Sequence, residues 1–333
     1  MSVMHRTTDA PLLQLGRWLQ QQGYHFVTPT PATHARVNAR PGRGVAKSLP
    51  DVFGWSRPFS PKLLPPDVLE WLKDGDVLEF ADGLMRSKVR FSTLMDSLYL
   101  HSAFPTMDGE AVFFGPDTYR FAALIQRTLA FRDKIDCIVD VGCGTGAGGI
   151  IAEKTLKHAV AQIILTDINA TALRYARINA EFAKTPNTSF RQGDLFGVID
   201  EPVDLILANP PYLLDPGARV YRHGGGALGS DLSTRIVLEG LPHLAANGTL
   251  ILYTGSPIVE GRDPFWESIA SAVQAANLHF EYAELDPDVF GEELDAAAYS
   301  QVDRIAAVAL VVTKAGPGLD ILAPMRNEIC RDR

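Results

Sequence analysis

The segment Asn209-Pro210-Pro211-Tyr212 carries the most specific chemistry in the sequence. Each proline fixes its own φ and pushes the preceding residue into an extended conformation. The side-chain oxygen of Asn209 and the carbonyl of Pro210 are then expected to converge on one point. Two acceptors at one point suit a planar NH₂ group, whose lone pair they would orient for in-line displacement. The acceptor would lie against Pro211 and Tyr212, with the tyrosine ring stacked on it.

A glycine-rich turn precedes this segment and indicates a cofactor site. Asp140-Val141-Gly142-Cys143-Gly144-Thr145-Gly146 follows the apolar, β-branched run Ile135 to Val141 and opens a helical stretch. Glycines allow a tight turn and a close approach of the backbone to a ligand. Amides at the helix N-terminus favour an anionic group such as a carboxylate, whereas Asp140 suits an ammonium group. Asp167, at the end of the next predicted strand, can accept both hydroxyls of a ribose.

A dinucleotide site is the competing interpretation of the same turn. Gly144, Gly146 and Gly149 satisfy the G-x-G-x-x-G pattern, and Asp167 follows 18 residues after Gly149. The pattern alone does not exclude NAD. The phase of the glycines, which begin at Gly142 directly after Asp140, favours an ammonium-bearing ligand over a pyrophosphate.

These motifs, with the Gly193-Asp194-Leu195-Phe196 turn, resemble in order and spacing the Rossmann-like S-adenosylmethionine-dependent methyltransferases. The resemblance runs from about Tyr119 to Thr313. It is greatest to the N-methylating branch that includes release-factor glutamine methyltransferases and ribosomal-RNA guanine-N2 methyltransferases. The reaction implied is methyl transfer from S-adenosylmethionine, leaving S-adenosylhomocysteine. The cofactor-binding residues implied are Asp140, Gly142, Cys143, Gly144, Gly146, Asp167, Ile168, Asp194, Leu195 and Asn209, with Asp194 beside the adenine. The catalytic residues implied are Asn209, Pro210 and Tyr212.

The stretch Tyr221-Arg222-His223-Gly224-Gly225-Gly226 follows soon after. In the resembling family, similar stretches form part of the wall on the acceptor side, which makes Tyr221, Arg222 and His223 candidate substrate-binding residues. A glycine-rich lid or a mobile surface loop fits the same composition. His223 as a general base is a further alternative. We expect no metal site.

Alternating strands and helices from Lys134 onward predict a doubly wound, seven-stranded and mostly parallel α/β sheet. The last two strands, His279 to Leu285 and Ile305 to Thr313, are expected to form an antiparallel hairpin at one edge. Residues 1–118, broken by many prolines, are expected to be a small accessory α+β domain, for which a helix followed by a hairpin suggests a winged-helix type. Residues 119–315 are expected to form the catalytic domain, and residues 316–333 a C-terminal tail.

Composition excludes some classes of protein. Of the 333 residues 46% are hydrophobic and 21% are charged, and the longest apolar run, Ile305 to Val312, is too short to span a bilayer. Three cysteines without metal-ligand spacing suit a cytoplasmic location. Through residue 130 there are 14 Lys and Arg against 12 Asp and Glu, a net charge of about +2. The remainder carries about −10, which gives the total of −8. That balance argues against extensive RNA contact.

The acceptor remains open at this point. A protein glutamine, a nucleobase amino group and a small molecule of natural-product biosynthesis all offer the required NH₂. Residues 1–118 show no long helices of the kind expected in a release-factor methyltransferase. An NAD-dependent oxidoreductase and a non-catalytic cofactor-binding protein are the alternatives from other classes.

Overall fold

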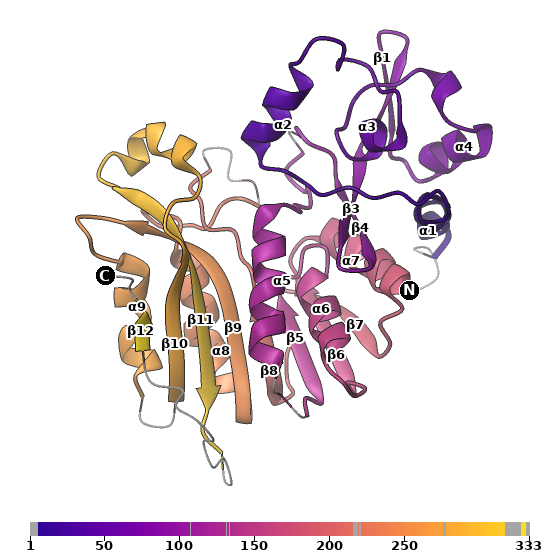
Figure 1. Ribbon diagram of the computed structural model, residues 1–333. Helices are drawn as coiled ribbons and strands as arrows, with labels where there is room; N and C mark the ends of the chain where they lie inside the picture. The colour runs from indigo at the N-terminus through magenta and orange to yellow at the C-terminus, as the bar shows by residue number, and fades with distance from the viewer. Residues whose placement is uncertain are drawn as a thin grey trace. The chain divides into compact units, whose positions relative to one another are not determined.

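The computed structural model describes residues 6–106, 108–130, 132, 134–215, 219, 221–275, 278–316 and 328–330. Its contacts divide the chain into two compact units (Figure 1). The first consists of Met1–Arg120, Gly144–Ala147 and Thr171–Pro186, and the second of Phe121–Cys143, Gly148–Ala170 and Asn187–Arg333. Most of the expected tail, residues 317–327 and 331–333, lies outside the described residues.

The second unit contains one mixed sheet, which confirms the predicted fold class. Its strand order is β12-β10-β11-β9-β8-β5-β6-β7. The strands are β5 (Cys137–Val141), β6 (Gln162–Asp167), β7 (Thr188–Gln192), β8 (Val203–Ala208), β9 (Leu244–Ile258), β10 (Leu278–Asp286), β11 (Arg304–Lys314) and β12 (Glu328–Cys330). The chain runs from β5 outward through β6 and β7, then returns to the other side of β5 for β8 and β9. This reversal is a topological switch point, where open α/β sheets bind ligands.

The antiparallel strand pair was predicted, but its surroundings differ from the expectation. β11 is antiparallel to both of its neighbours, β9 and β10, and lies between them. The short strand β12 pairs in parallel with β10, so the sheet has eight strands and β10 is not its edge. Residues 287–303 connect β10 to β11 and contain two 3₁₀ helices, η3 (Gly291–Asp295) and η4 (Ala297–Tyr299). The connection between the two antiparallel strands is therefore a long segment with short helices of its own.

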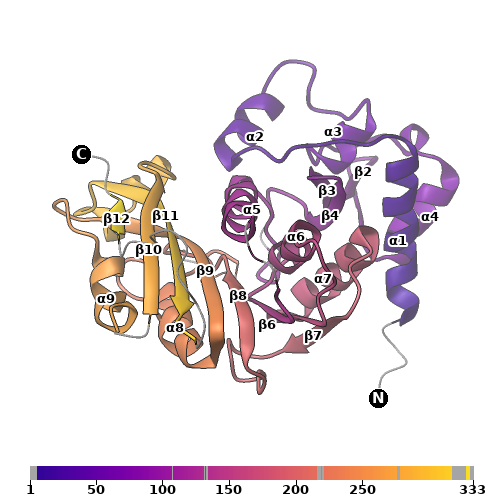
Figure 2. The same ribbon diagram turned by 60° about the horizontal axis from the view of Figure 1, so that its bottom comes forward.

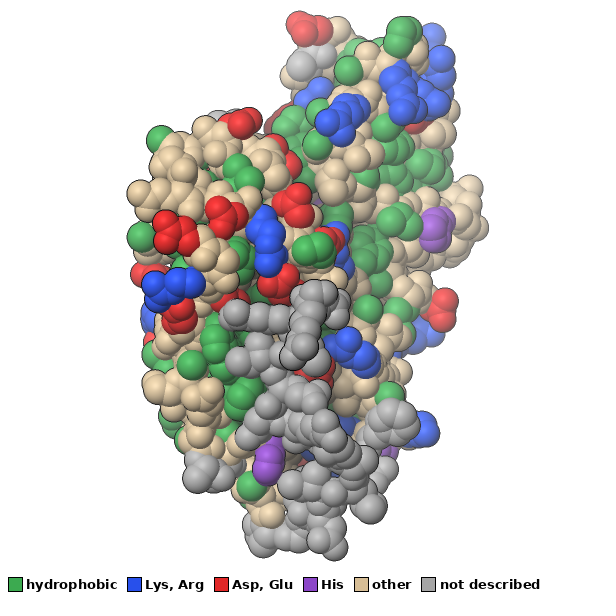
Figure 3. All heavy atoms as spheres, turned by 60° about the vertical axis from the view of Figure 1, so that its left-hand side comes forward, with side chains coloured by type: hydrophobic (Ala, Val, Ile, Leu, Met, Phe, Trp, Pro, Cys, Tyr) green, Lys and Arg blue, Asp and Glu red, His purple; other side chains and the backbone are tan. Residues whose placement is uncertain are grey.

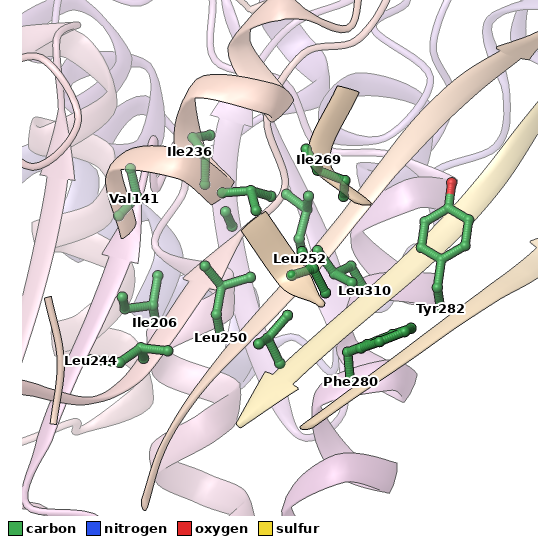
Figure 4. Packing of buried hydrophobic residues seen from close by; sticks show 14 of the residues in the cluster. Val141, Ile206, Ile236, Leu244, Leu250, Leu252, Ile269, Phe280, Tyr282 and Leu310 are labelled. Carbon is green, nitrogen blue, oxygen red and sulfur yellow. The ribbon is translucent and has the colours of Figure 1, made fainter. Parts of the chain in front are cut away.

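The core of this unit follows from the alternation of side chains along the strands. On one face of the sheet, apolar side chains of β5, β8, β9, β10 and β11 pack against the helices α8 (Asp231–Gly240) and α9 (Pro264–Val273). Figure 4 shows Val141, Ile206, Leu252 and Leu310 of this layer beside Ile236 and Ile269 of the helices. Asp140, on the opposite face of β5, contacts the helix α6 (Ala147–Thr155). Helices thus cover both faces, as the fold class requires.

The first unit is more helical than the many prolines suggested. It contains α1 (Arg6–Gln21), α2 (Pro31–Asn38), α3 (Leu49–Phe53), η1 (Pro61–Leu63), α4 (Pro66–Asp74), most of α7 (Ala170–Ala183) and the start of α5 (Pro116–Leu129). Several helices begin with proline at the first positions, where the missing N–H has no intrahelical partner to lose. Prolines therefore begin several of the helices in this unit.

Two antiparallel hairpins complete the first unit (Figures 1 and 2). The predicted hairpin around Asp82-Gly83 is present as β1 (Leu78–Ala81) and β2 (Leu84–Ser87), and both turn residues have positive φ. The second hairpin, β3 (Val89–Leu94) with β4 (Ser97–Ser102), was not predicted. It packs in an apolar cluster that includes Leu12 of α1 and Tyr175 of α7.

No helix among the described residues is both long and apolar enough to cross a membrane. Cys137 and Cys143 are buried free thiols. In the described part of the chain, no group of three or more His, Cys, Asp or Glu side chains is arranged to hold a metal ion.

The N-terminus of α9 provides a test of how this sheet is stabilised. The buried carboxylate of Asp263 accepts hydrogen bonds from the Trp266 amide (2.9 Å), the Ser256 hydroxyl (2.6 Å) and the Tyr282 hydroxyl (2.7 Å). Asp263→Ala removes the helix cap and leaves two buried hydroxyls without this acceptor. We expect the free energy of unfolding in urea to fall by about 2–4 kcal/mol. Asp67→Ala, an exposed acid in the first turn of α4, should cost less than about 1 kcal/mol. Equal losses of stability in the two variants would contradict the role of Asp263 as a cap and a buried acceptor.

Candidate active site

The site is built at one edge of the sheet by the register of three parallel strands. Val141 of β5 pairs with Thr166 of β6 on one side and with Ala208 of β8 on the other. The residues that follow these three positions are Gly142, Asp167 and Asn209. Parallel strands end at the same edge, so the glycine turn, the predicted ribose acid and the Asn-Pro-Pro-Tyr segment begin side by side.

The glycine turn has the conformation that only glycine adopts easily. Gly142 has φ +62°, and a Cβ added there would meet no atom within 4 Å. The next residue is secured, because the Cys143 N–H donates to the Thr166 carbonyl at 2.9 Å. Gly144 and Gly146, assigned to the first unit, also have positive φ. The backbone at Gly142 therefore faces open space that a side chain would fill, which is the form of a ligand cradle.

Asp140 holds the start of the helix that follows the turn. Its Oδ2 accepts the Gly149 amide at 2.9 Å, and its side chain is buried, with 2% of the residue exposed. Burial raises the pKa of Asp140 to about 7, while hydrogen bonds from Gly149 and Gly148 oppose the rise and the Asp167 carboxylate adds to it. A cation beside these two carboxylates would be favoured, because it would offset the cost of keeping both ionised.

The end of β6 presents an acid and an apolar side chain together. Asp167 is 9% exposed, and its Oδ1 accepts the Asn169 amide at 2.9 Å while its carbonyl accepts the Gly193 amide at 3.1 Å. Ile168 beside it is 52% exposed, which is high for a large apolar residue. An acid next to an exposed apolar surface suits a ribose attached to a flat base.

The turn after β7 carries Asp194, which was predicted to lie beside the adenine. The Asp194 side chain is exposed, and its Oδ2 accepts from Arg235 of α8 at 3.0 Å. Leu195 is 6% exposed and has φ +45°, and its side chain packs in the sheet core. The Asp194 carboxylate thus already has one cationic partner, and its predicted contact with an adenine amino group stays a prediction.

The Asn-Pro-Pro-Tyr segment is packed tightly on its C-terminal side. Asn209 is half-buried at the end of β8, and Tyr212 is 4% exposed. The Tyr212 ring lies directly over Gly255 of β9, where a Cβ would come within 2.1 Å of Cδ2. It also meets the Phe290 ring edge to face, with centroids 5.9 Å apart. This packing makes Tyr212 a rigid anchor, and its stacking on an acceptor stays a prediction.

The residues after the segment form an internally bonded loop. Leu213 pairs with His223 in an isolated bridge, and the Gly224 amide donates to the Leu213 carbonyl at 2.8 Å. The Asp215 amide donates to Nδ1 of His223 at 3.2 Å. A backbone amide can only donate, so a neutral His223 carries its proton on Nε2. That tautomer leaves no free acceptor nitrogen, which weakens the hypothesis of His223 as a general base.

The two other predicted substrate residues are engaged within the same loop. Arg222 forms an ion pair with Glu293 of η3 and lies 3.6 Å from Asp215. Tyr221 accepts a hydrogen bond from Arg219, whose guanidinium lies over the tyrosine ring. These side chains therefore shape the loop, and direct contact with a substrate stays a prediction for each of them.

Sequence reasoning missed the partners of this loop. Phe290, Glu293 and Tyr299 all belong to the connection between β10 and β11, more than 70 residues after the residues they contact. No spacing pattern links positions so far apart. The one sequence signal is local: the acid-rich Gly291-Glu292-Glu293-Leu294-Asp295 run falls between the two predicted strands of the hairpin.

Comparison with known proteins supports the interpretation of these motifs. Residues 121–258 match the family model of the methyltransferase small domain. The ribosomal protein uL3 glutamine methyltransferase of Bordetella pertussis is 35% identical over 150 residues, covering 40% of this chain and 50% of that protein. The release factor glutamine methyltransferase of Cereibacter sphaeroides is 33% identical over 172 residues, covering 46% and 56%.

A third relative acts on RNA according to its name. The ribosomal RNA small subunit methyltransferase C of Haemophilus influenzae is 29% identical over 168 residues, covering 47% of this chain and 44% of that protein. The chain thus spans about half the length of these curated relatives. The region matched by the family model includes the glycine turn, Asp167 and Asn209. The resemblance inferred from the motifs is therefore confirmed: residues 121–258 match the methyltransferase small domain model, and the relatives are methyltransferases by name.

Proposed function

We propose that this chain is an S-adenosylmethionine-dependent N-methyltransferase that methylates a planar NH₂ group and releases S-adenosylhomocysteine. The observation that carries the proposal is the register of β6, β5 and β8, which brings the glycine turn, Asp167 and Asn209 to one edge. The match of residues 121–258 to the methyltransferase small domain model supports it.

The residues at this edge fit the cofactor. Open space over Gly142 accommodates the methionine moiety, and the carboxylates of Asp140 and Asp167 favour a cationic ligand. Asp167 would hold the ribose hydroxyls, and exposed Ile168 would cover a face of the adenine. When bound, S-adenosylmethionine supplies a methyl group already activated by a sulfonium. An NAD site remains the alternative for the same turn.

The chain's own contribution to the reaction is orientation. The Asn209 side-chain oxygen and the Pro210 carbonyl would accept the two hydrogens of the NH₂ group and so direct its lone pair. Positioning of this kind can supply much of the rate acceleration. No general base is required, since the nitrogen becomes acidic once it has been alkylated, and His223 in its neutral form offers a donor.

A glutamine side chain of a protein is the acceptor that the charges favour. Residues 287–303, which contact the loop after Asn-Pro-Pro-Tyr, contain five acids and no Lys, Arg or His. Acidic side chains gather on one part of the face shown in Figure 3, with a few basic ones beside them. Such a surface repels a phosphate backbone. Two of the three relatives above are named as glutamine methyltransferases, which also supports a protein acceptor.

Two further expectations accompany this proposal. The first unit, with its basic segment between Ala10 and Pro50, would select the acceptor. The free thiols of Cys137 and Cys143 suit a reducing cytoplasm.

The cofactor site can be tested by filling the open space at Gly142. Gly142→Ala should weaken S-adenosylmethionine binding by roughly tenfold or more, measured by calorimetric titration. Gly83→Ala is the matched control, because Gly83 also has positive φ and open space but lies in the β1–β2 turn. Both variants should lose about 1 kcal/mol of stability from backbone strain. Tight binding of NAD by the wild type, with none of S-adenosylmethionine, would disprove the proposed function.

The acceptor site can be tested at Asn209. Asn209→Ala removes one of the two oxygens that orient the nitrogen, so turnover should fall by roughly 100-fold or more while cofactor affinity changes less than about twofold. Single-turnover kinetics and calorimetry measure the two quantities separately. Parallel loss of both would show that Asn209 serves mainly to bind the cofactor.

The class of acceptor can be determined by labelling. Purified enzyme is incubated with a cell lysate and S-adenosylmethionine labelled in its methyl group, and the protein, RNA and small-molecule fractions are counted. We expect the label in protein, and hydrolysis should release it as methylamine from a glutamine amide. Label confined to RNA or to small molecules would refute the protein acceptor and leave N-methyl transfer intact.

A further inference from the structure

Three residues of the β10–β11 connection contact the loop that carries the predicted acceptor residues. We call the described residues 209–215, 219 and 221–224 the acceptor loop, and residues 287–303 the β10–β11 segment. Tyr299 Oη accepts the Leu214 amide at 2.8 Å. Glu293 forms an ion pair with Arg222, and the Phe290 ring packs on the Tyr212 ring.

The β10–β11 segment is itself attached to the sheet at both ends. The Val289 amide donates to the Ile305 carbonyl of β11, and the Asp303 amide donates to the Ile258 carbonyl of β9, each at 2.8 Å. Tyr299 is 1% exposed. The β10–β11 segment is therefore held on the sheet at both ends, where it contacts the acceptor loop.

The backbone of Phe290, in the β10–β11 segment, has a strained conformation. It has φ +56° and ψ +38°, a left-handed conformation that is costly for a bulky side chain. The conformation coincides with the placement of its ring against Tyr212. Surrounding contacts must stabilise such a residue, and strain of this kind concentrates at functional sites.

Charged side chains of the acceptor loop complement Glu293 of the β10–β11 segment. The buried carboxylate of Asp215 accepts two hydrogen bonds from the Arg219 side chain, at 2.8 and 2.5 Å, and one from its amide, at 2.9 Å. These bonds lower the pKa of Asp215 to about 2, so it is ionised at neutral pH. Arg222 then lies between two carboxylates, Asp215 on its own loop and Glu293 on the β10–β11 segment.

The contact at Leu214 lies close to Asn209 along the chain. Only Tyr212 and Leu213 separate Leu214 from the two prolines, whose φ angles are fixed. Misplacement of a reacting group by about 1 Å can cost about 100-fold in rate. Contacts that hold Leu214 and Arg222 therefore affect the orientation of the acceptor nitrogen.

We propose that the β10–β11 segment positions the acceptor loop for methyl transfer, with Tyr299 and Glu293 as positioning residues. This inference rests on the proposed function for its kinetic consequence. Its structural consequence, order in the acceptor loop, is independent of any activity.

Tyr299→Phe tests the hydrogen bond to Leu214. It keeps the ring and removes the hydroxyl, so kcat should fall roughly tenfold while the acceptor KM and the cofactor Kd change less than about twofold. Tyr282→Phe is the matched control, since Tyr282 of β10 is also almost fully buried and its hydroxyl bonds Asp263 instead. The control should lose stability without losing kcat. Equal kcat in the two variants would overturn the proposal.

Glu293→Gln tests the ion pair, with Glu292→Gln as the control that removes the same charge one residue away on the exposed side. We expect kcat to fall roughly threefold or more in Glu293→Gln and to remain at the wild-type value in Glu292→Gln. A similar fall in both variants would indicate a general effect of charge and would overturn the role of Glu293.

Hydrogen exchange separates this inference from the proposed function. Exchange at the amides of Leu214, Asp215 and Gly224 should be roughly tenfold faster in Tyr299→Phe than in the wild type or in Tyr282→Phe. Absence of methyl transfer by the wild type would refute the proposed function, and exchange would still decide whether the segment orders the loop. Unchanged exchange at these amides would overturn the positioning role.

Discussion

The register between β5 and its two parallel neighbours is the constraint on which the candidate site depends. Val141, Thr166 and Ala208 occupy paired positions, so the three segments that follow them emerge at one edge. A shift of one residue in either pairing would turn each strand's apolar side chains to the other face. The packing of Val139 and Ile206 against the helices on one face, and the contact of Asp140 with α6 on the other, oppose such a shift. The register that packs the core is thus the same register that brings the three segments of the candidate site together.

Buried charge at this edge connects stability to ligand binding. Asp140 is buried, accepts backbone amides from α6 and has a second carboxylate, Asp167, in its vicinity. Burial of acids without a cation is costly to the folded protein. A cationic ligand at this edge would reduce that cost, which is a physical reason for a site of this composition to favour a sulfonium or an ammonium over a pyrophosphate.

The acceptor loop obtains its shape from long-range contacts as well as from hydrogen bonds within its own sequence. Its glycines permit many conformations, whereas the Leu214 amide, the Arg222 guanidinium and the Tyr212 ring each have a specific partner elsewhere. Arg222 illustrates the consequence. Its position in a glycine-rich stretch suggested a group free to contact substrate, and the structure places it in an ion pair with η3. The conformation of this loop is therefore decided by the β10–β11 segment as much as by the motif.

The sequence by itself determined the α/β fold, the parallel strands and the chemical character of the site, because these depend on local patterns. Apolar β-branched runs indicate buried strands, glycines with positive φ mark the turn at Gly142, and two prolines stiffen the chain after Asn209. Only the tertiary structure decided that β12 extends the sheet, that β3 and β4 form a second hairpin, and that Phe290, Glu293 and Tyr299 contact the acceptor loop. The contacts of the acceptor loop join residues more than 70 positions apart, and no periodicity or spacing records them. Folding alone brings such residues together, since their pairing is selected by packing and charge in three dimensions.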